Sequence, residues 1–491
     1  MQLKKIILVP AVLFTLSLLV MYCNQPAGPG EETNTGVTPV DLPVKVPGFN
    51  FPEDSTKIYG WLNSPGMPLK YDSASVYKHA WGVWAGLTAS TNQVFAGDSL
   101  LVYETWMGIS EIKEAIVQLN SAGAFKAAGK KGRGKLERPR QFEHGFHVVN
   151  KIPALKAALA APKNDTIDTN ASNNQWVTVS YSPAAANYAI QNKILDLSVL
   201  NKYQVPGGIG SIPAFPNAAV TIKPTYFVGS ETDSLIQIPV WPGAPSPADS
   251  FSFGRWPRCV YADVHNRQQP NKKVVPALQS DRNPASVLAA TCNLSDFINF
   301  KVDSAMAAYM NASDSSNGGN GPSFAHKGSI AILVGMHVAT KEISNWTWQS
   351  YYWAPNPDQP FTPSSNLAAS LRPSQITGAA AHYAVVAAYA MVLPNQPING
   401  GTNTGTTNVY GYNPYLEASF FGLSPGLPNN QFGVQSNCMS CHGLATVDGG
   451  LNYNTDIYFP MNDTMFLNRV QLDFAWSIQG NLINDTAVKK K

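Results

Sequence analysis

The stretch Ser329-Ile-Ala-Ile-Leu-Val-Gly-Met336 is a run of aliphatic residues typical of a strand buried on both faces. Two further segments, Val220–Phe227 (VTIKPTYF) and Ser234–Trp241 (SLIQIPVW), are rich in β-branched and aromatic residues, and we expect them to form a strand pair. The proline inside each segment predicts an edge position or a bulge. A helix is expected over Leu294–Met310. These patterns predict an α+β fold rich in antiparallel strands.

The composition indicates a globular protein with few charges. The 491 residues are 44% hydrophobic and only 13% charged, against roughly 25% charged residues in typical soluble domains. Many Tyr, Trp, Asn and Pro suit a secreted, turn-rich protein with much β structure. The net charge of +3 argues against a general nucleic-acid or acidic-polymer binder. This length allows one large core or two domains.

The strongest chemical signal is the C-x-x-C-H motif Cys438-Met439-Ser440-Cys441-His442. This spacing suits covalent attachment of one haem, because two thiols three positions apart can add to the two vinyl groups of a porphyrin. His442 would then be the proximal iron ligand. A zinc site would need a second Cys or His pair at short spacing, and the sequence has none. A thioredoxin-like dithiol normally follows a strand of a βαβ unit and does not require the histidine.

The N-terminus predicts export. Two lysines precede an apolar run that ends at Tyr22, which is typical of a signal peptide over residues 1–22. Residues 20–23 (VMYC) resemble a bacterial lipobox, so Cys23 is the expected lipidation site; cleavage near Ala27-Gly28 and release as a soluble protein is the alternative. Residues 23–45 are expected to be a flexible tether. The predicted location is extracytoplasmic: the bacterial periplasm or outer membrane, with a lipid anchor.

The remaining cysteines could form one disulfide. Cys259 and Cys292 are left after lipidation of Cys23 and haem attachment, and an oxidising compartment favours a bridge between them. The alternative is two separate buried thiols, because the sequence does not place their Cα atoms within reach.

The C-terminal stretch resembles a class I cytochrome c: an attachment motif, a loop, a methionine and a final helix near Leu472–Ile478. The resemblance implies a small, mainly helical haem c segment at 409–491, behind a β-rich main body at 46–398. The methionine follows the motif sooner than in that family, and residues 428–433 are a poor version of its first helix. We therefore expect the body to wall part of the haem. Four segments also resemble large bacterial extracytoplasmic lipoproteins that end in a single C-x-x-C-H, a group without an established activity: residues 336–353, 413–420, 435–445 and 472–478.

The sixth iron position decides between electron transfer and chemistry on a bound substrate. Met461, in a proline-led loop, is the first candidate and Met465 the second; each could equally be a packing residue. The body offers four histidines and a nearby aromatic cluster that could line a haem edge or simply pack. These residues are His144, His147, His337 and His382, with Trp346, Trp348, Tyr351, Tyr352 and Trp353.

Three functions remain open at this point. The first is an extracytoplasmic monohaem c-type cytochrome that passes electrons to a redox partner protein. The second is a haem-dependent oxidoreductase with a substrate pocket in the body, and the third is a haem-based binding or sensory lipoprotein. The sequence does not decide whether the protein is an enzyme. A basic loop at 126–140, with seven basic residues and one glutamate, is either a docking site for an anionic partner or a solvated loop.

Overall fold

The structure is a computed structural model. It describes residues 37–67, 71–95, 97–122, 143–144, 175–243, 256–270, 272–316, 325–393, 407–417, 436–449, 451 and 458–483. The chain divides into two compact units, Met1–Thr35 and Gly36–Lys491, and every described residue belongs to the second. The predicted signal peptide, Cys23 and the basic loop lie outside the described residues, and so does His147.

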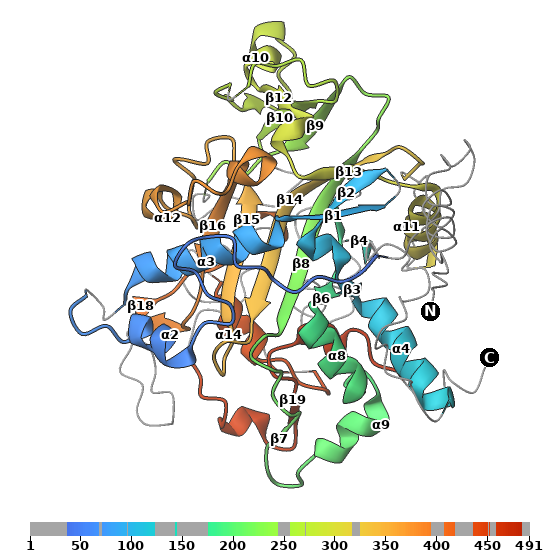
Figure 1. Cartoon of the computed structure of the whole chain (residues 1–491), viewed down its shortest axis with the longest axis vertical. Helices are drawn as coiled ribbons and strands as arrows, with labels where there is room; N and C mark the ends of the chain where they lie inside the picture. The colour runs from blue at the N-terminus through green and yellow to red at the C-terminus, as the bar shows by residue number, and fades with distance from the viewer. Residues whose placement is uncertain are drawn as a thin grey trace, which may run out of the picture. The chain divides into compact units, whose positions relative to one another are not determined.

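A large antiparallel sheet forms the centre of this unit (Figure 1). Its strands run in the order β16-β15-β14-β8-β5-β4; β13 also pairs with β14, β6 with β8, and β3 with β6. The predicted buried strand is confirmed as β14, whose residues are nearly all buried. The strand bounds are β3 Met107–Gly108, β4 Glu143–His144, β5 Gln175–Val177, β6 Ser180–Tyr181, β8 Val220–Gly229, β13 Asn299–Lys301, β14 Ile330–Thr340, β15 Thr347–Trp353 and β16 Tyr383–Ala387.

The expected pairing of residues 220–227 with 234–241 is wrong. Strand β8 lies between β14 and the β5 and β6 strands, whereas β9 (Leu235–Pro239) pairs with β10 (Arg258–Asp263) in another sheet. The proline rule holds in a different form, because β8 is an interior strand. On one side of β8, Pro224 lies next to a register shift at Leu333/Gly335 of β14. On the other side it lies opposite the break between β5 and β6, where Thr178 donates its backbone N–H to the Pro224 carbonyl.

A small lobe at the top of Figure 1 contains this second sheet. Strand β10 pairs with β9, with β11 (Ala277–Leu278) and with β12 (Thr291–Asn293), while helix α10 covers Pro284–Ala289. Cys259 and Cys292 are both buried, unbridged thiols, so the expected disulfide is absent. Cys292 pairs with Ala262, three residues along β10 from Cys259. That offset is about 10 Å along a strand and reverses the side-chain face, whereas a disulfide needs Cα atoms within about 7 Å.

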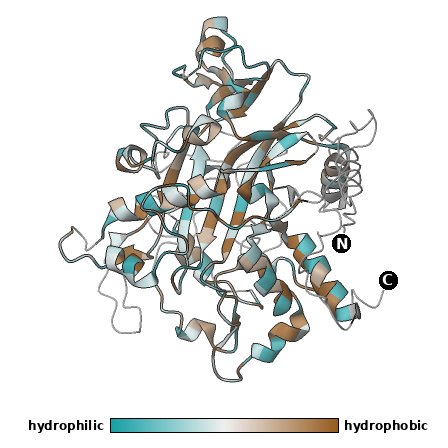
Figure 2. Ribbon diagram, viewed as in Figure 1, coloured by the Kyte–Doolittle hydropathy of each residue, from teal (hydrophilic) through white to brown (hydrophobic). Residues whose placement is uncertain are grey.

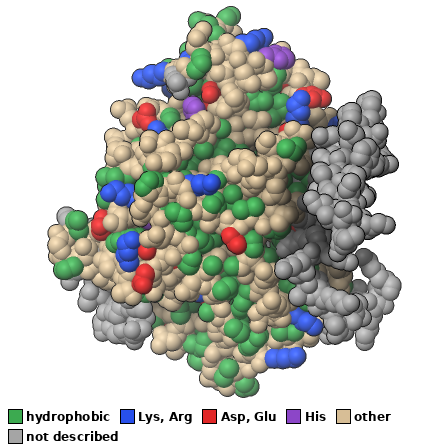
Figure 3. Space-filling view, in the orientation of Figure 1, with side chains coloured by type: hydrophobic (Ala, Val, Ile, Leu, Met, Phe, Trp, Pro, Cys, Tyr) green, Lys and Arg blue, Asp and Glu red, His purple; other side chains and the backbone are tan. Residues whose placement is uncertain are grey.

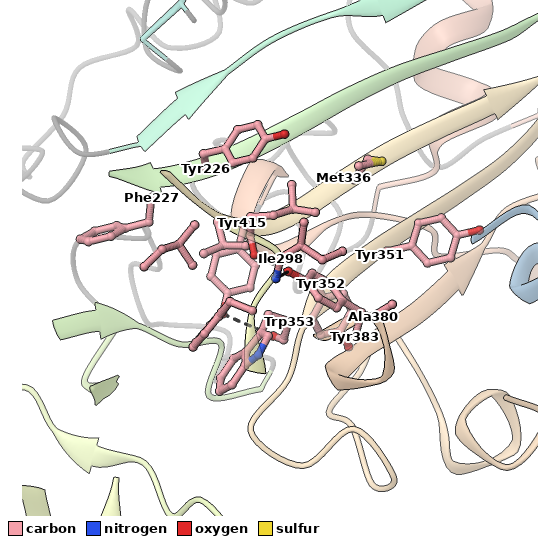
Figure 4. Close-up of a cluster of buried hydrophobic side chains, with 14 of the residues drawn as sticks. Tyr226, Phe227, Ile298, Met336, Tyr351, Tyr352, Trp353, Ala380, Tyr383 and Tyr415 are labelled. Carbon is pink, nitrogen blue, oxygen red and sulfur yellow. Dashed lines mark hydrogen bonds between the residues drawn. The ribbon is translucent and has the colours of Figure 1, made fainter. Parts of the chain in front are cut away.

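One face of the central sheet packs against helix α3 (Ser73–Leu87). Asp72 caps its N-terminus by accepting from the Ser75 N–H, and Trp84 stacks on Tyr351 with 4.4 Å between ring centroids. Trp84 Nε1 also donates to the Ala380 carbonyl at 3.0 Å. Figure 4 shows part of the buried cluster, in which the Tyr383 hydroxyl accepts from the Ile298 N–H at 3.2 Å. Its rings and aliphatic side chains exclude water from this face.

The opposite face packs against α4 (Ile109–Ala122), α8 (Pro183–Gln191) and the C-terminal residues, which share a second hydrophobic core. Figure 2 shows α4 alternating between hydrophobic and hydrophilic residues, as a helix with one buried side should. Charged side chains are sparse on the visible surface in Figure 3. The other helices and 3-10 turns are α2 Ser55–Leu62, η2 Val102–Thr105, α9 Leu197–Leu200, η3 Asn201–Tyr203, η5 Leu294–Asp296, α11 Ser304–Ser316, α12 Asn366–Ser370, η6 Gly378–His382, α13 Pro414–Glu417, α14 Cys438–Gly443, η7 Thr464–Phe466 and α15 Trp476–Gln479.

Two element predictions need correction. The expected helix over Leu294–Met310 divides into the turn η5, strand β13 and helix α11. The final helix near Leu472–Ile478 is only the single turn α15, preceded by strand β19 (Val470–Gln471), which pairs with β7 (Gly210–Ser211). In both cases pairing with a distant strand outweighs local helix propensity. Two further small sheets join β1 (Ser90–Phe95) to β2 (Asp98–Leu101) and β17 (Val392–Leu393) to β18 (Thr407–Asn408).

The last part of the expected tether packs against the body. Leu42 is buried, and the Val40 carbonyl accepts a hydrogen bond from Trp106 Nε1 at 2.7 Å. Residues 37–45 are therefore anchored, because burial of Val37 and Leu42 opposes free movement of the chain. No helix among the described residues is both long and apolar enough to cross a membrane. The boundary between body and haem segment stays a prediction, since residues 394–406 lie outside the described ranges.

Candidate haem site

The C-x-x-C-H motif forms the short helix α14, and Asn437 caps its N-terminus. The Asn437 side-chain oxygen accepts from the Ser440 N–H at 3.0 Å, while its amide donates to the carbonyls of Ala390 at 3.0 Å and Val409 at 2.7 Å. Asn437 is fully buried. A single amide therefore both starts the helix and attaches it to the chain around β17 and β18.

His442 has the arrangement of a proximal ligand. Its Nδ1 is 2.9 Å from the Phe474 carbonyl, so Nδ1 carries the proton and Nε2 is left with a lone pair for a metal. Among the described residues, Nε2 has no hydrogen-bond partner. Burial lowers the pKa of His442 to about 3, against the opposing effect of the hydrogen bond to Phe474, and the nearby Lys223 also lowers it. The ring is therefore neutral at physiological pH, as metal ligation requires.

The surroundings of Cys438 disfavour its thiolate form. Burial raises the pKa of Cys438 well above its usual range, and the neighbouring Glu417 and Cys441 raise it further. A redox-active C-x-x-C motif instead lowers the pKa of its exposed cysteine. Among the described residues, no group of three or more His, Cys, Asp and Glu side chains could hold a metal ion by itself. A neutral Cys438 thiol beside a neutral histidine differs from the thiolate that a zinc site uses.

A strained turn supplies the carbonyl that holds His442. Asp473 has φ 46° and Phe474 has φ 69°, both in the left-handed region that non-glycine residues rarely adopt. Each such residue costs about 1–3 kcal/mol and persists only where its surroundings hold it. Trp476 follows the turn and donates from Nε1 to the Cys441 carbonyl at 2.9 Å. This second contact binds the turn to α14.

Strands β14 and β15 of the body form a wall beside the motif. The Trp348 ring lies against the His442 ring, with 4.1 Å between centroids and 36° between planes. His337 and Ser350 pair across the two strands on this same face, and Ser350 Oγ is 2.9 Å from His337 Nδ1. His337 Nε2 is 2.5 Å from Glu417 Oε1. The body therefore packs against the motif, while the expectation that it walls part of a haem stays a prediction.

Gly335 makes room for the segment that presents Glu417. It pairs with Tyr352 on the face of the sheet that carries His337. A Cβ at Gly335 would lie 2.8 Å from the Asn413 side chain, which is closer than real Cβ atoms approach. Asn413 uses this space to donate to Ser350 Oγ and to the Tyr351 carbonyl, each at 2.8 Å. These bonds dock α13, and with it Glu417, onto the sheet.

A cavity of about 820 Å³ adjoins α14 at Met439. Met439 and His442 are three residues apart in α14, so they are neighbours on the surface of this helix. The cavity is lined by Met439, Phe459, Met461, Phe474, Lys341 and Asp473, among others. Met461 lines this cavity together with Met439, whereas Glu417 and His337 pair with each other near Cys438 and His442. Met465 is partly buried in the same core as α14.

The other candidate histidines are placed differently. His382 lies beside Trp353, and Trp353 is five residues, or about 17 Å, along β15 from Trp348. His382 Nε2 is 3.7 Å from Asp296 Oδ1, so His382 belongs to the far end of the sheet. His144 contributes its backbone to β4, opposite Trp176, and its side chain lies outside the described residues.

Several residues of the site were not identified from the sequence. Asn437, Glu417 and the Asp473–Phe474 turn lie in segments for which the sequence showed a resemblance, but their individual roles depend on contacts with distant parts of the chain. A weak signal did exist for Lys341, because a charged residue directly follows the apolar strand β14. A charge in that position is buried only when a partner neutralises it.

Comparison with known proteins adds no relative. No family model matches the chain, no curated protein matches it, and no solved structure matches it. The interpretation therefore depends on the motif and on the geometry around it.

Proposed function

We propose that the protein is an extracytoplasmic monohaem c-type cytochrome that transfers electrons. One haem would be bound covalently through Cys438 and Cys441, with His442 as the proximal iron ligand and residues 409–491 as a small, mainly helical haem segment. The observation that carries the proposal is the bond from His442 Nδ1 to the Phe474 carbonyl, because it orients Nε2 for iron and makes the imidazole more basic. When bound, the haem would supply a one-electron Fe(III)/Fe(II) couple.

The surroundings of the motif support an electron-transfer role. Trp348 packs against the His442 ring, and the wall formed by β14 and β15 holds this ring in a single orientation. A rigid ligand set keeps the structural change between the two iron oxidation states small. The site lies against a body of several hundred residues, so a redox partner would dock on a large surface.

The sixth iron ligand belongs to the same proposal. Met461, Met465 and His337 all stay predictions; both ring nitrogens of His337 are in hydrogen bonds, to Ser350 and Glu417, so it would have to give one of them up to bind iron. A carboxylate bonded to a histidine is the usual partner of an iron- or zinc-ligating imidazole. Comparing Met461→Ala with His337→Ala tests the choice. Loss of the low-spin optical spectrum in only one of the two variants would identify the ligand.

The proposed location is the periplasm or the outer membrane, with lipid on Cys23 as the anchor. The support is the apolar run up to Tyr22 and the lipobox-like residues 20–23. Metabolic labelling with a radioactive fatty acid should mark the wild-type protein and not a Cys23→Ala variant. Equal labelling of the two would remove the anchor from the proposal.

Covalent haem is the central test. The protein should be produced in a bacterial host with c-type maturation, denatured, separated on a gel and stained for haem peroxidase activity. We expect about one haem per wild-type chain and none in the Cys438→Ser/Cys441→Ser double variant. A Cys259→Ser/Cys292→Ser variant is the matched control, because it removes two other thiols and should retain the haem. Absence of haem from the wild-type chain in a competent host would refute the proposal.

A second candidate function is a haem-dependent oxidoreductase, and the cavity beside Met439 favours it. Its volume of about 820 Å³ is in the range of small-molecule sites. High-spin iron that binds carbon monoxide in the reduced protein would support this alternative. Six-coordinate iron without carbon monoxide binding would support the electron carrier.

A further inference from the structure

A buried ion pair lies directly behind the carbonyl that holds His442. Lys341 Nζ is 2.5 Å from Asp473 Oδ1, and the side chains are 5% and 10% exposed. Lys341 also donates to the Ser344 carbonyl at 2.6 Å and lies 5.5 Å from the centre of the Trp346 ring. The body therefore contacts the C-terminal segment through a charged group as well as through the apolar ring of Trp348.

The ion pair acts on the strained turn itself. Asp473 is the first of the two left-handed residues, and Phe474, whose carbonyl accepts from His442, is the second. The other carboxylate oxygen of Asp473 accepts from the Phe215 N–H at 2.9 Å. Both oxygens of Asp473 are thus bound to groups of the body, which fixes the position of this residue and the direction of the next peptide.

Stability alone gives a poor account of this ion pair. A buried pair often contributes little net stability, because removing two charges from water costs about as much as their attraction returns. Two apolar side chains could fill the same space. What an apolar pair cannot do is hold a left-handed aspartate at a defined distance and angle from the body.

We propose that the Lys341–Asp473 ion pair is a positioning device for the proximal histidine. It holds the Asp473–Phe474 turn in its left-handed conformation and so keeps the Phe474 carbonyl within hydrogen-bond distance of His442 Nδ1. This bond makes the imidazole more basic and favours Fe(III), so loss of the ion pair should raise the reduction potential of the haem. The inference rests on the proposed haem attachment.

The test is the reduction potential of the purified haem-bearing protein, measured by optical redox titration. For Lys341→Met we expect the potential to rise by about 59 mV, which is about a tenfold change in the one-electron equilibrium and lies at the lower end of effects known for residues behind a metal ligand. The sign discriminates between causes. Loss of a positive charge acting only through space would lower the potential, or leave it unchanged if Asp473 took up a proton.

Three further variants control the experiment. Glu342→Gln removes a buried carboxylate one residue away that binds His79 and not Asp473, so it measures the effect of a lost negative charge. Lys341→Arg keeps the charge and should retain most of the wild-type potential. The Lys341→Met/Asp473→Asn double variant leaves no unpaired buried charge, so it remains testable if a single variant does not fold, and it should show the same rise.

The outcomes separate the two proposals. A rise in Lys341→Met and in the double variant, beyond that of Glu342→Gln and largely reversed by Lys341→Arg, supports positioning. An unchanged or lower potential in Lys341→Met with haem in place overturns the inference while leaving the haem attachment intact. A wild-type chain without covalent haem overturns the proposed function itself.

Discussion

Replacement of Asn437 by alanine tests the structural basis of the motif helix. Asn437 is fully buried and makes one accepted and two strong donated hydrogen bonds. Loss of a helix N-cap costs about 1 kcal/mol. Each of the two backbone carbonyls that loses its donor adds about 1–3 kcal/mol. The smallest of these values together amount to about 3 kcal/mol of unfolding free energy.

The assay is urea denaturation of the haem-free chain at pH 7, followed by tryptophan fluorescence. Asn437→Ser separates the contributions, because a serine hydroxyl can still cap the helix but cannot reach both carbonyls; we expect it to lose about 2 kcal/mol. The matched control is Asn283→Ala. Asn283 also caps a helix, accepting from the Ala285 N–H at 2.9 Å, but it is exposed. Its replacement should cost about 1 kcal/mol or less.

One result would refute this reasoning. If Asn437→Ala costs no more than Asn283→Ala, then the donated bonds to the carbonyls of Ala390 and Val409 do not hold α14 in place. The description of the motif helix as anchored to the β17–β18 region would then be wrong. A loss near 3 kcal/mol together with an intermediate value for serine would confirm it.

Three other predictions follow from the described contacts. Burial alone would raise the pKa of Asp263, but hydrogen bonds from Arg267, the His265 N–H and Gln268 lower it from 3.8 to about 2. Asp263 therefore stabilises the protein above pH 4 by up to about 2 kcal/mol, and solvent screening at the exposed Arg267 reduces this value. The contribution disappears as the pH falls from 4 to 2. Urea denaturation curves of the wild type and Asp263→Asn at pH 7 and pH 3 measure it. Cys259 and Cys292 should both react with a thiol reagent after denaturation without reductant, and a linked peptide pair in mass spectrometry would contradict this. Lys341→Met and Asp473→Asn should each lower the free energy of unfolding in urea by about 3–5 kcal/mol, because each leaves one buried charge unpaired. The double variant should be close to wild type. Additive losses would show that the two charges are not coupled.

Part of the fold follows from local sequence patterns. The aliphatic run at 329–336 predicts β14, because a short, continuous apolar run that contains β-branched residues is typical of a strand buried on both faces. The partner of residues 234–241 was not predictable in the same way. These residues pair with β10 instead of β8, since the choice between two hydrophobic strands depends on which one the tertiary structure brings near.

The register between strands shows the same limit. Counting cysteines suggested a bridge between Cys259 and Cys292, and the two residues do lie on neighbouring strands. They are three residues out of register, so their side chains point to opposite faces of the sheet. Composition and redox compartment say nothing about register, because it is fixed by packing of one face against the core.

The motif Cys438–His442 needed no tertiary information to indicate haem, because the chemistry of attachment and proximal ligation is confined to five consecutive residues. The state of His442 did need it. The Phe474 carbonyl is 32 residues away in the chain, Trp348 is 94 away, and Lys341 acts through Asp473. Hydrogen-bond strength and burial depend on distances of tenths of an ångström. The sequence by itself therefore predicts which group the motif would bind, and only the folded structure determines how His442, the proposed iron ligand, is held.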